Sequence, residues 1–246
     1  MTRDEGAPGG WALTVIAVLL TMGSAAADIM AFTRLGNVFA SVMTSNILFL
    51  GLAAARRSGT LAAHAAVSFA GYVAGVAAAS RLARRPSPGT SAASQSPWTP
   101  WVAAALGVEA VMLVGFTIGW EVTGARPSGG TQLLLIFLAT LAMGMQSAVV
   151  VILNISRVAT TYLTGTLTAL IDSLARPGED RGTAQREANI RRASVLAGLV
   201  VGALLAGLLI TAAPAAVPAI PLAALAAVLL IGLTRLRDRQ VARNGR

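Results

Sequence analysis

Residues 35–52 read LGNVFASVMTSNILFLGL, which places small and hydroxylated side chains inside an apolar run. A related stretch, residues 155–170, reads ISRVATTYLTGTLTAL. Residues 43–46 and 163–166 then fall opposite each other at an offset of 120 residues. We therefore predict two related halves, each of which turns one polar-centred segment toward a shared interior.

The composition is that of a protein whose solvent is the lipid bilayer. Of the 246 residues, 55% are apolar and 12% are charged, whereas about a quarter of the residues in a soluble domain are charged. The mean hydropathy is +0.71. Six runs hold roughly the 17 to 25 apolar residues that a helix needs to cross a bilayer: 11–27, 61–80, 101–120, 132–153, 193–211 and 215–233. An all-α integral membrane protein is predicted.

The apolar runs form two halves of about four segments each, because a shorter segment follows the first long run of each half. The shorter segments, residues 39–52 and 158–174, carry polar groups in their middle. Such a segment is a poor lipid-facing helix and requires helix contacts or a wet cavity. Full spans, half-helices and re-entrant segments all stay open for these two. The predicted organisation is an N-terminal tail (1–10), a first membrane repeat (11–120), a second membrane repeat (131–234) and a basic C-terminal tail (235–246).

The positive charges are topology signals, since all 19 are arginines that gather at the ends of apolar runs. Under the positive-inside rule, eight spans would place 14 arginines inside and five outside. Re-entrant second and sixth segments would place 15 inside and four outside. Both topologies put the termini and residues 175–192 in the cytoplasm. In the second, each half crosses an odd number of times and the halves are inverted, an architecture of secondary transporters.

Several classes of function find no support in the sequence. A nucleic-acid partner is not expected, because the arginines are explained by topology and no soluble basic face with stacking aromatics is visible. The chain has no cysteine and one histidine, so neither a metal site nor a cofactor is expected. No nucleophile–base pair, phosphate loop or metal-ligand spacing indicates an enzyme.

Two sets of residues resemble the signatures of a known family. The first set is residues 39–46, FASVMTSN, preceded by Asp28, and the second is residues 142–148, AMGMQSA, with residues 160–168, TTYLTGTLT. They are similar to the paired signatures of the YoaK-like family of bacterial multi-spanning membrane proteins, whose function is uncharacterised. The resemblance covers nearly the whole chain and implies a multi-pass protein of the cytoplasmic (inner) membrane that is suspected of transport. Ser45 stands where the family usually has glycine.

Two carboxylates lie within apolar runs and are candidates for a binding site. Asp28 and Glu109 are costly there, by about 2.5 to 3.5 kcal/mol on insertion scales, so a functional role is the default expectation. The alternative for Asp28 is a helix-end residue that touches headgroups or Arg34. The alternative for Glu109 is a structural pair with a hydroxyl group or an arginine from another helix.

The remaining site candidates are small or polar residues of the central segments. Hydroxyl and amide groups can bind a solute without a fixed charge, and glycine permits close approach of the backbone. The alternative is that these groups only join helices by hydrogen bonds. The candidates are Thr44, Ser45, Asn46, Gln146, Thr164, Gly165 and Thr166.

The leading hypothesis is a secondary transporter of a small polar or anionic solute that works by alternating access between the halves. The alternative is a non-transporting membrane scaffold or sensor whose arginine-rich cytoplasmic loops bind anionic lipid or a partner. Glycine ladders at Gly71 and Gly75, and at Gly198 and Gly202, permit a homodimer under either hypothesis.

Overall fold

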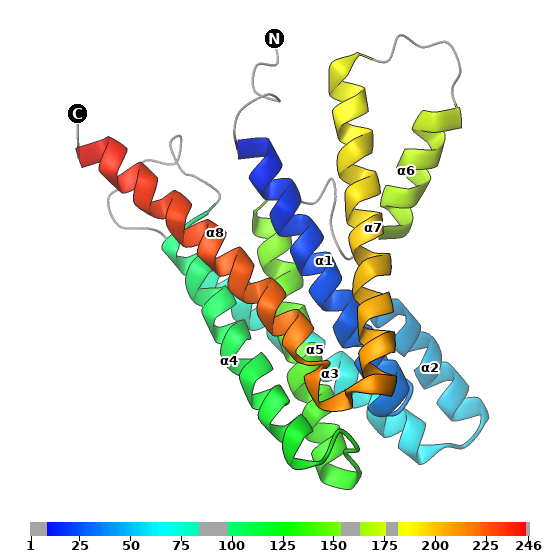
Figure 1. Ribbon diagram of the computed structural model, residues 1–246. Helices are drawn as coiled ribbons and strands as arrows, with labels where there is room; N and C mark the ends of the chain where they lie inside the picture. The colour runs from blue at the N-terminus through cyan, green and yellow to red at the C-terminus, as the bar shows by residue number, and fades with distance from the viewer. Residues whose placement is uncertain (1–8, 84–97, 154–162, 176–181, 245–246) are drawn as a thin grey trace.

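The computed structural model describes residues 9–83, 98–153, 163–175 and 182–244, and within these ranges it is helical, as predicted (Figure 1). The N-terminal tail therefore lies almost wholly outside the described residues. Residues 235–244 of the basic C-terminal tail continue the last helix. The elements are α1 (Gly9–Arg34), α2 (Met43–Ala55), α3 (Gly59–Ala83), α4 (Pro100–Val122), α5 (Gly129–Ile152), α6 (Leu163–Ala175), α7 (Thr183–Ala212), the short 3₁₀ helix η4 (Pro214–Ala216) and α8 (Ala219–Asn244).

Six of these helices are long and apolar enough to cross a membrane, and two are shorter. The short helices α2 and α6 have 13 residues each. At 1.5 Å per residue each extends about 20 Å, which is less than the roughly 30 Å hydrocarbon core of a bilayer. The starts of α2 and α6 lie 120 residues apart, and so do their ends. The predicted alignment of the two polar-centred segments therefore coincides with the helix boundaries.

The α2 segment leaves and returns at one end of the bundle. Gly36 follows α1, and its carbonyl oxygen lies 3.3 Å from Nδ1 of His64 in the second turn of α3. The end of α1 and the start of α3 are thus neighbours (Figure 1). Because these two helix ends lie together, the intervening α2 does not cross the layer that the long helices define.

The directions of α3 and α5 are fixed by two close contacts. Gly71 lies against Phe137, and Gly75 lies against the carbonyl of Leu141. The contacted residue of α5 moves toward its C-terminus as the glycine of α3 does, so the two helices run parallel. The helix α5 therefore ends at the end of the bundle where the chain termini lie (Figure 1).

The same relationship holds between α1 and α7. Gly198 lies against Val18, and Gly202 lies against the carbonyl of Met22, so α7 runs parallel to α1 and begins at the termini's end. The helix α6 therefore connects a helix end and a helix start on one side, as α2 does on the other side. Three long helices precede α5 and three begin with it, which agrees with the re-entrant topology and not with eight spans.

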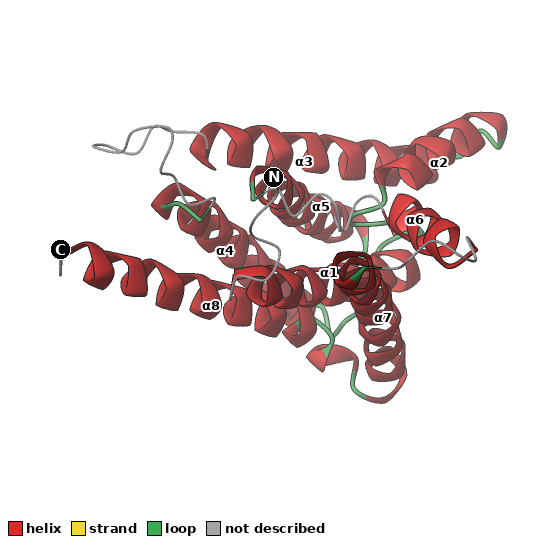
Figure 2. Ribbon diagram, turned by 90° about the horizontal axis from the view of Figure 1, so that it is seen from above, coloured by secondary structure: helices red, strands yellow, loops and turns green. Residues whose placement is uncertain are grey.

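The helices pack as two bodies that differ from the two sequence halves. In the first, α3 packs along α5, α4 packs on α5, and α2 packs on α3; we call α2–α5 the contiguous body. In the second, α1 packs along α7 and α8, and α6 packs on α7; we call these helices the split body. Figure 2 shows the two side by side, joined where α4 meets α8 and α1 meets α5. Thus α1 and α5 each pack mainly with helices of the other half.

The glycine ladders are used inside the chain. Gly71 and Gly75 are buried against α5, and Gly198 and Gly202 are buried against α1. A side chain at Gly75 or Gly202 would collide with the backbone of the facing helix. The homodimer stays a prediction, but it requires a face other than these ladders.

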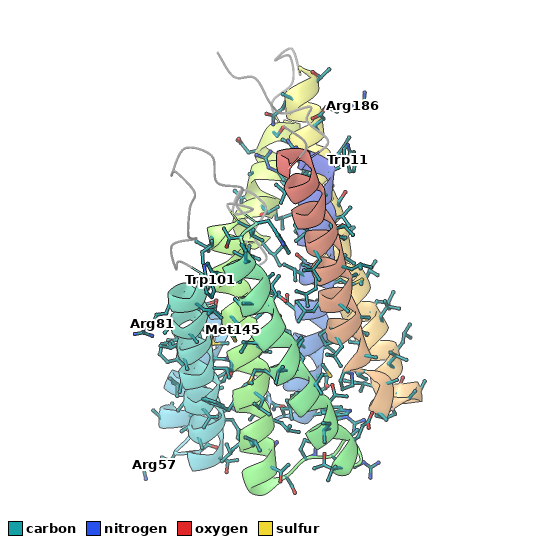
Figure 3. All side chains as sticks on the ribbon, turned by 90° about the vertical axis from the view of Figure 1, so that its left-hand side faces the viewer. Trp11, Arg57, Arg81, Trp101, Met145 and Arg186 are labelled. Carbon is teal, nitrogen blue, oxygen red and sulfur yellow. The ribbon has the colours of Figure 1, made fainter. Side chains whose placement is uncertain are left out.

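The ends of the molecule differ in charge. Figure 3 shows Arg186 at one end of the molecule, Arg57 at the opposite end and Arg81 between them. Arg191 and Arg192 belong to the first turns of α7, beside Arg186. The helix α7 begins within residues 175–192, which the sequence suggested as a loop, and so extends the bundle at the basic end.

Candidate functional site

The loop that leads into α2 is held by Asn46. This residue is fully buried, and its Oδ1 accepts a hydrogen bond from the Phe39 N–H group at 2.9 Å. Its Nδ2 donates to the Phe39 carbonyl at 2.7 Å and to Ser68 Oγ at 2.6 Å. The Ser68 hydroxyl also donates to the Phe39 carbonyl, at 3.0 Å. One amide thus satisfies both backbone groups of Phe39 and joins α2, α3 and the loop.

The same loop is bound to α1 through Asp28. The Ser41 N–H group donates to Asp28 Oδ1 at 2.7 Å, and the Ser41 hydroxyl donates to Oδ2 at 2.6 Å. Asp28 is 7% exposed, so its carboxylate faces the protein interior. The alternative contact with Arg34 is not formed, because that guanidinium donates to the carbonyl of Ile210 near the end of α7. Asp28 thereby connects the split body to the start of the contiguous body.

Three phenylalanines cover the other side of this loop. The Phe39 ring stacks on Phe32 of α1 at a centroid distance of 5.2 Å and on Phe49 of α2 at 6.2 Å. Such stacking adds to the area that the rings bury. The backbone hydrogen bonds of Phe39 and the stack on its ring together hold the loop in one position.

The first turns of the two short helices present polar groups at the surface of the chain. In α2, Thr44 is exposed and Ser45 is half-buried; in α6, Thr164 and Gly165 are exposed and Thr166 is buried. A Cβ atom at Gly165 would meet nothing within 4 Å. The backbone there is thus open to approach by another molecule. The fourth residue of each helix, Asn46 or Thr166, is the one that turns inward.

Figures 1 and 2 place α2 and α6 at the same edge of the bundle, with α6 toward the termini's end and α2 toward the opposite end. Each packs on one long helix of its own body, α2 on α3 and α6 on α7. The two polar first turns therefore belong to different bodies.

Gln146 of α5 joins the two bodies in the interior. Its Nε2 donates to the carbonyl of Leu20 in α1 at 3.2 Å, and the side chain is buried. The neighbouring Ser147 is buried as well. Gln146 thus lies at the contact of α1 with α5 and not on the first turns of the short helices.

Glu109 of α4 is the exception among the buried polar residues. It is 0% exposed, and neither carboxylate oxygen has a hydrogen-bond partner among the residues that the structure describes. The predicted alternative, a structural pair with a hydroxyl group or an arginine, is thus not formed within that part of the chain. Buried polar groups are normally paired, so this carboxyl group calls for an explanation.

The structure does not bring the predicted site residues together. Asp28 and Asn46 hold one loop, Gln146 and Glu109 lie in separate places between helices, and the first-turn residues of α2 and α6, among which Thr166 is buried, lie at the edge. Ser68 was not among the predicted site residues, because its only signal is a serine within the apolar run of α3. Ser41 was not predicted as the partner of Asp28 either.

The fold defines a class: a multi-pass helical membrane protein with six long candidate spans and two short helices that return to the end from which the chain came. The chain belongs to the family described as protein of unknown function (DUF1275), whose model matches residues 16–231. This confirms the family that the two signatures indicated.

A named relative is the UPF0700 transmembrane protein YoaK of Bacillus subtilis (strain 168). It is 28% identical to this chain over 157 residues, which are 64% of this chain and 65% of YoaK. The match therefore covers slightly less than two thirds of the relative's length. No solved structure matches the chain.

Proposed function

We propose that the protein is a secondary transporter of a small polar or anionic solute in the cytoplasmic membrane, and that it works by alternating access. The observation that carries this proposal is the pair of short helices whose polar first turns are exposed in the chain. Irregular backbone at membrane depth is tolerated only where protein buries it or where it borders a water-filled path. Helix starts at such a depth supply backbone N–H groups and a positive dipole end to a solute.

An inverted duplication is supported by the order of the helices and by their packing. In each half, a long helix is followed by a short helix and then by two more long helices. The packing of α3 on α5 is mirrored by α7 on α1, that of α4 on α5 by α8 on α1, and that of α2 on α3 by α6 on α7. This is the pattern expected for two copies related by a two-fold axis in the membrane plane. Such copies can exchange roles when access alternates.

The residues of the first turns would contact the solute. Thr44 and Ser45 from α2 and Thr164 from α6 carry hydroxyl groups that both donate and accept hydrogen bonds. Gly165 leaves room for a solute to reach the backbone of α6. Asn46 supports this arrangement indirectly, because its amide is fully used in holding the loop before α2.

Access would alternate by movement of the contiguous body against the split body. Three described contacts between them are hydrogen-bonded: Asp28 with Ser41, Gln146 with the Leu20 carbonyl, and Trp120 Nε1, which donates to the Pro214 carbonyl at 2.9 Å. They join the bodies at different heights. A shift of one body against the other has to exchange some of these contacts for others.

The test begins with a melting-temperature screen of detergent-purified protein against sulfate, phosphate, acetate, glycine and glycerol. A solute that binds the folded state raises the melting temperature. Uptake of each stabilising solute into proteoliposomes follows. Thr44→Ala and Thr164→Ala are expected to reduce uptake at least tenfold, while Leu48→Ala in α2, whose side chain is 73% exposed, retains it. Normal uptake in both threonine variants would sink the proposal.

A second candidate function, a membrane scaffold or sensor, is favoured by the basic end of the molecule. Arg186, Arg191 and Arg192 all lie within the first ten residues of α7, where anionic lipid or an acidic partner would bind. For this function, neutralising the three arginines would abolish activity and the first-turn threonines would be dispensable. The two sets of variants therefore separate the two hypotheses.

A further inference from the structure

We infer that Glu109 is the proton-binding residue of this protein, a carboxyl group that holds a proton while the two bodies are closed around it. The inference rests on the proposed transport function and adds the coupling ion. It starts from a buried acidic group that takes no part in holding the loop or the short helices.

The burial of Glu109 is complete, and its two oxygens lack partners in the described part of the chain. An unpaired carboxylate in such a place would cost several kcal/mol, even where bilayer insertion scales give the lowest values. The group is therefore neutral in this conformation, with a proton on one oxygen. The step is a simple ionisation, in which the carboxyl group releases one proton and becomes a carboxylate.

The position of Glu109 places it between the bodies. It is followed on the same face of α4 by Leu113, Phe116 and Trp120, all of which are buried. Glu109 and Trp120 are eleven residues apart, which is three helical turns, so their side chains leave the helix in nearly the same direction. Trp120 donates to the carbonyl of Pro214, just before α8 of the split body. Glu109 therefore faces the split body across the contact of α4 with α8.

No charged partner faces Glu109 from the helices that pack on α4. The helix α5 has no acidic, basic, histidine or tyrosine residue, and α8 has none before Arg235. The helix α3 contributes three titratable groups. His64 is engaged with Gly36 near its start, Arg81 lies in its last turn, and Tyr72 lies between them.

The other buried acidic residue of the described chain, Asp28 of α1, is engaged by Ser41. No group of three or more histidine, cysteine, aspartate or glutamate residues that could hold a metal ion occurs within the ranges that the structure covers. A metal cation needs several oxygen ligands, whereas a single carboxyl group suffices for a proton. A proton is therefore the cation that a single carboxyl group at this position would bind.

Separation of the bodies would hydrate Glu109 from one side of the membrane. In water a carboxyl group ionises readily at neutral pH, so the proton would leave on that side. Closing the bodies again would require a proton to return before the carboxylate is buried. The movement of the bodies and the movement of one proton would thereby be coupled.

The direct test is infrared spectroscopy of the protein in lipid nanodiscs. Glu109→Gln is compared with wild type and with Glu121→Gln, a matched control at the exposed end of the same helix. At neutral pH we expect the carbonyl stretch of a protonated carboxyl group in wild type and in Glu121→Gln, and its loss in Glu109→Gln. A spectrum of Glu109→Gln that keeps the whole band would overturn the inference.

A thermal melt tests whether Glu109 has a structural role. Glu109→Gln and Glu109→Leu should melt at or above the wild-type temperature, because neither substitution removes a described hydrogen bond. A clear loss of melting temperature in both variants would show that Glu109 has a structural partner and would count against proton binding.

Coupling is tested in proteoliposomes with sulfate, phosphate, acetate, glycine and glycerol as probes. In wild type an imposed pH gradient should drive accumulation of a transported probe. Glu109→Gln should still exchange that probe across the membrane but lose at least tenfold of the accumulation. Undiminished pH-driven accumulation in Glu109→Gln would overturn the coupling role. If wild type moves no probe while the infrared band still depends on Glu109, the proposed transport fails and the proton site stands.

Discussion

Asn46 binds Phe39 as a neighbouring β-strand would, with its Oδ1 accepting from the Phe39 N–H group and its Nδ2 donating to the Phe39 carbonyl. Buried backbone polar groups need such partners, above all within a bilayer. The side chain therefore makes it possible for the chain to change direction at membrane depth. The sequence predicted that the polar centre of the signature binds a solute. Its residue Asn46 instead holds the loop before α2.

Asn46→Ala is expected to destabilise the protein by about 1 to 3 kcal/mol, because it leaves the Phe39 backbone groups without their partners. Thr44→Ala, two residues earlier and exposed, should change stability little. Thermal unfolding in detergent compares the two. Equal melting temperatures for wild type and Asn46→Ala would contradict the geometry described for this loop.

Ser41→Ala removes the hydroxyl group that donates to Asp28 Oδ2. One oxygen of a buried carboxylate then loses its hydrogen bond, and we expect a loss of about 1 to 3 kcal/mol. Asp28→Ala removes the partner of both Ser41 donors and should cost at least as much. Ser45→Ala, in the same segment and half-buried, serves as the matched control in the same melting experiment.

Gly202→Ala should impair folding strongly, since the new methyl group would collide with the backbone at Met22. Gly207→Ala on the same helix has open space around it and should be neutral or stabilising by up to about 1 kcal/mol, as alanine is the better helix former. The yield of monodisperse protein and its melting temperature measure both effects. Comparable behaviour of the two variants would mean that α7 does not lie on α1 as described.

Water access to the first turns can be measured directly because the chain has no cysteine. Thr44→Cys and Thr164→Cys should react with a membrane-impermeant thiol reagent, since the proposal places both on an aqueous path. Val111→Cys in α4 and Leu230→Cys in α8, also exposed in the chain, should face lipid and stay unlabelled. Protection of both threonine positions would remove the aqueous path from the proposal.

Arg57 and Arg186 lie at opposite ends of the molecule (Figure 3), so a bundle that spans the bilayer would expose them on opposite sides. With the basic end in the cytoplasm, as the positive-inside rule requires, Arg57→Cys should be labelled from outside intact cells and Arg186→Cys only after lysis. Labelling of both residues from the same side would contradict three membrane crossings, by α3, α4 and α5, between them.

The sequence predicted the helical class, the six long runs and the two short polar-centred segments, because length and apolar composition decide these features directly. It left open whether the short segments cross, since the arginine distribution barely distinguishes the two topologies. The contact of Gly36 with His64 brings the end of α1 beside the start of α3 and thereby favours an α2 that does not cross. Such a contact between residues 28 positions apart has no signature in a single sequence.

The site could be predicted only in part. Asp28, Asn46 and Glu109 were chosen because polar groups are costly in lipid, and all three are buried. Cost alone, however, does not reveal partners. Ser41 and Ser68 pair with Asp28 and Asn46, whereas Glu109 has no described partner, and only the three-dimensional register of the helices distinguishes these cases.

The packing of α1 and α5 with helices of the other sequence half has a consequence for biogenesis. Met22 and Gly202, which touch, are 180 residues apart, so the first helix made must wait in the bilayer for its neighbours until synthesis is nearly complete. The contiguous body needs only residues up to Ile152. A nascent chain arrested after α5 would therefore hold one assembled body and a helix α1 that still lacks its α7 and α8 neighbours.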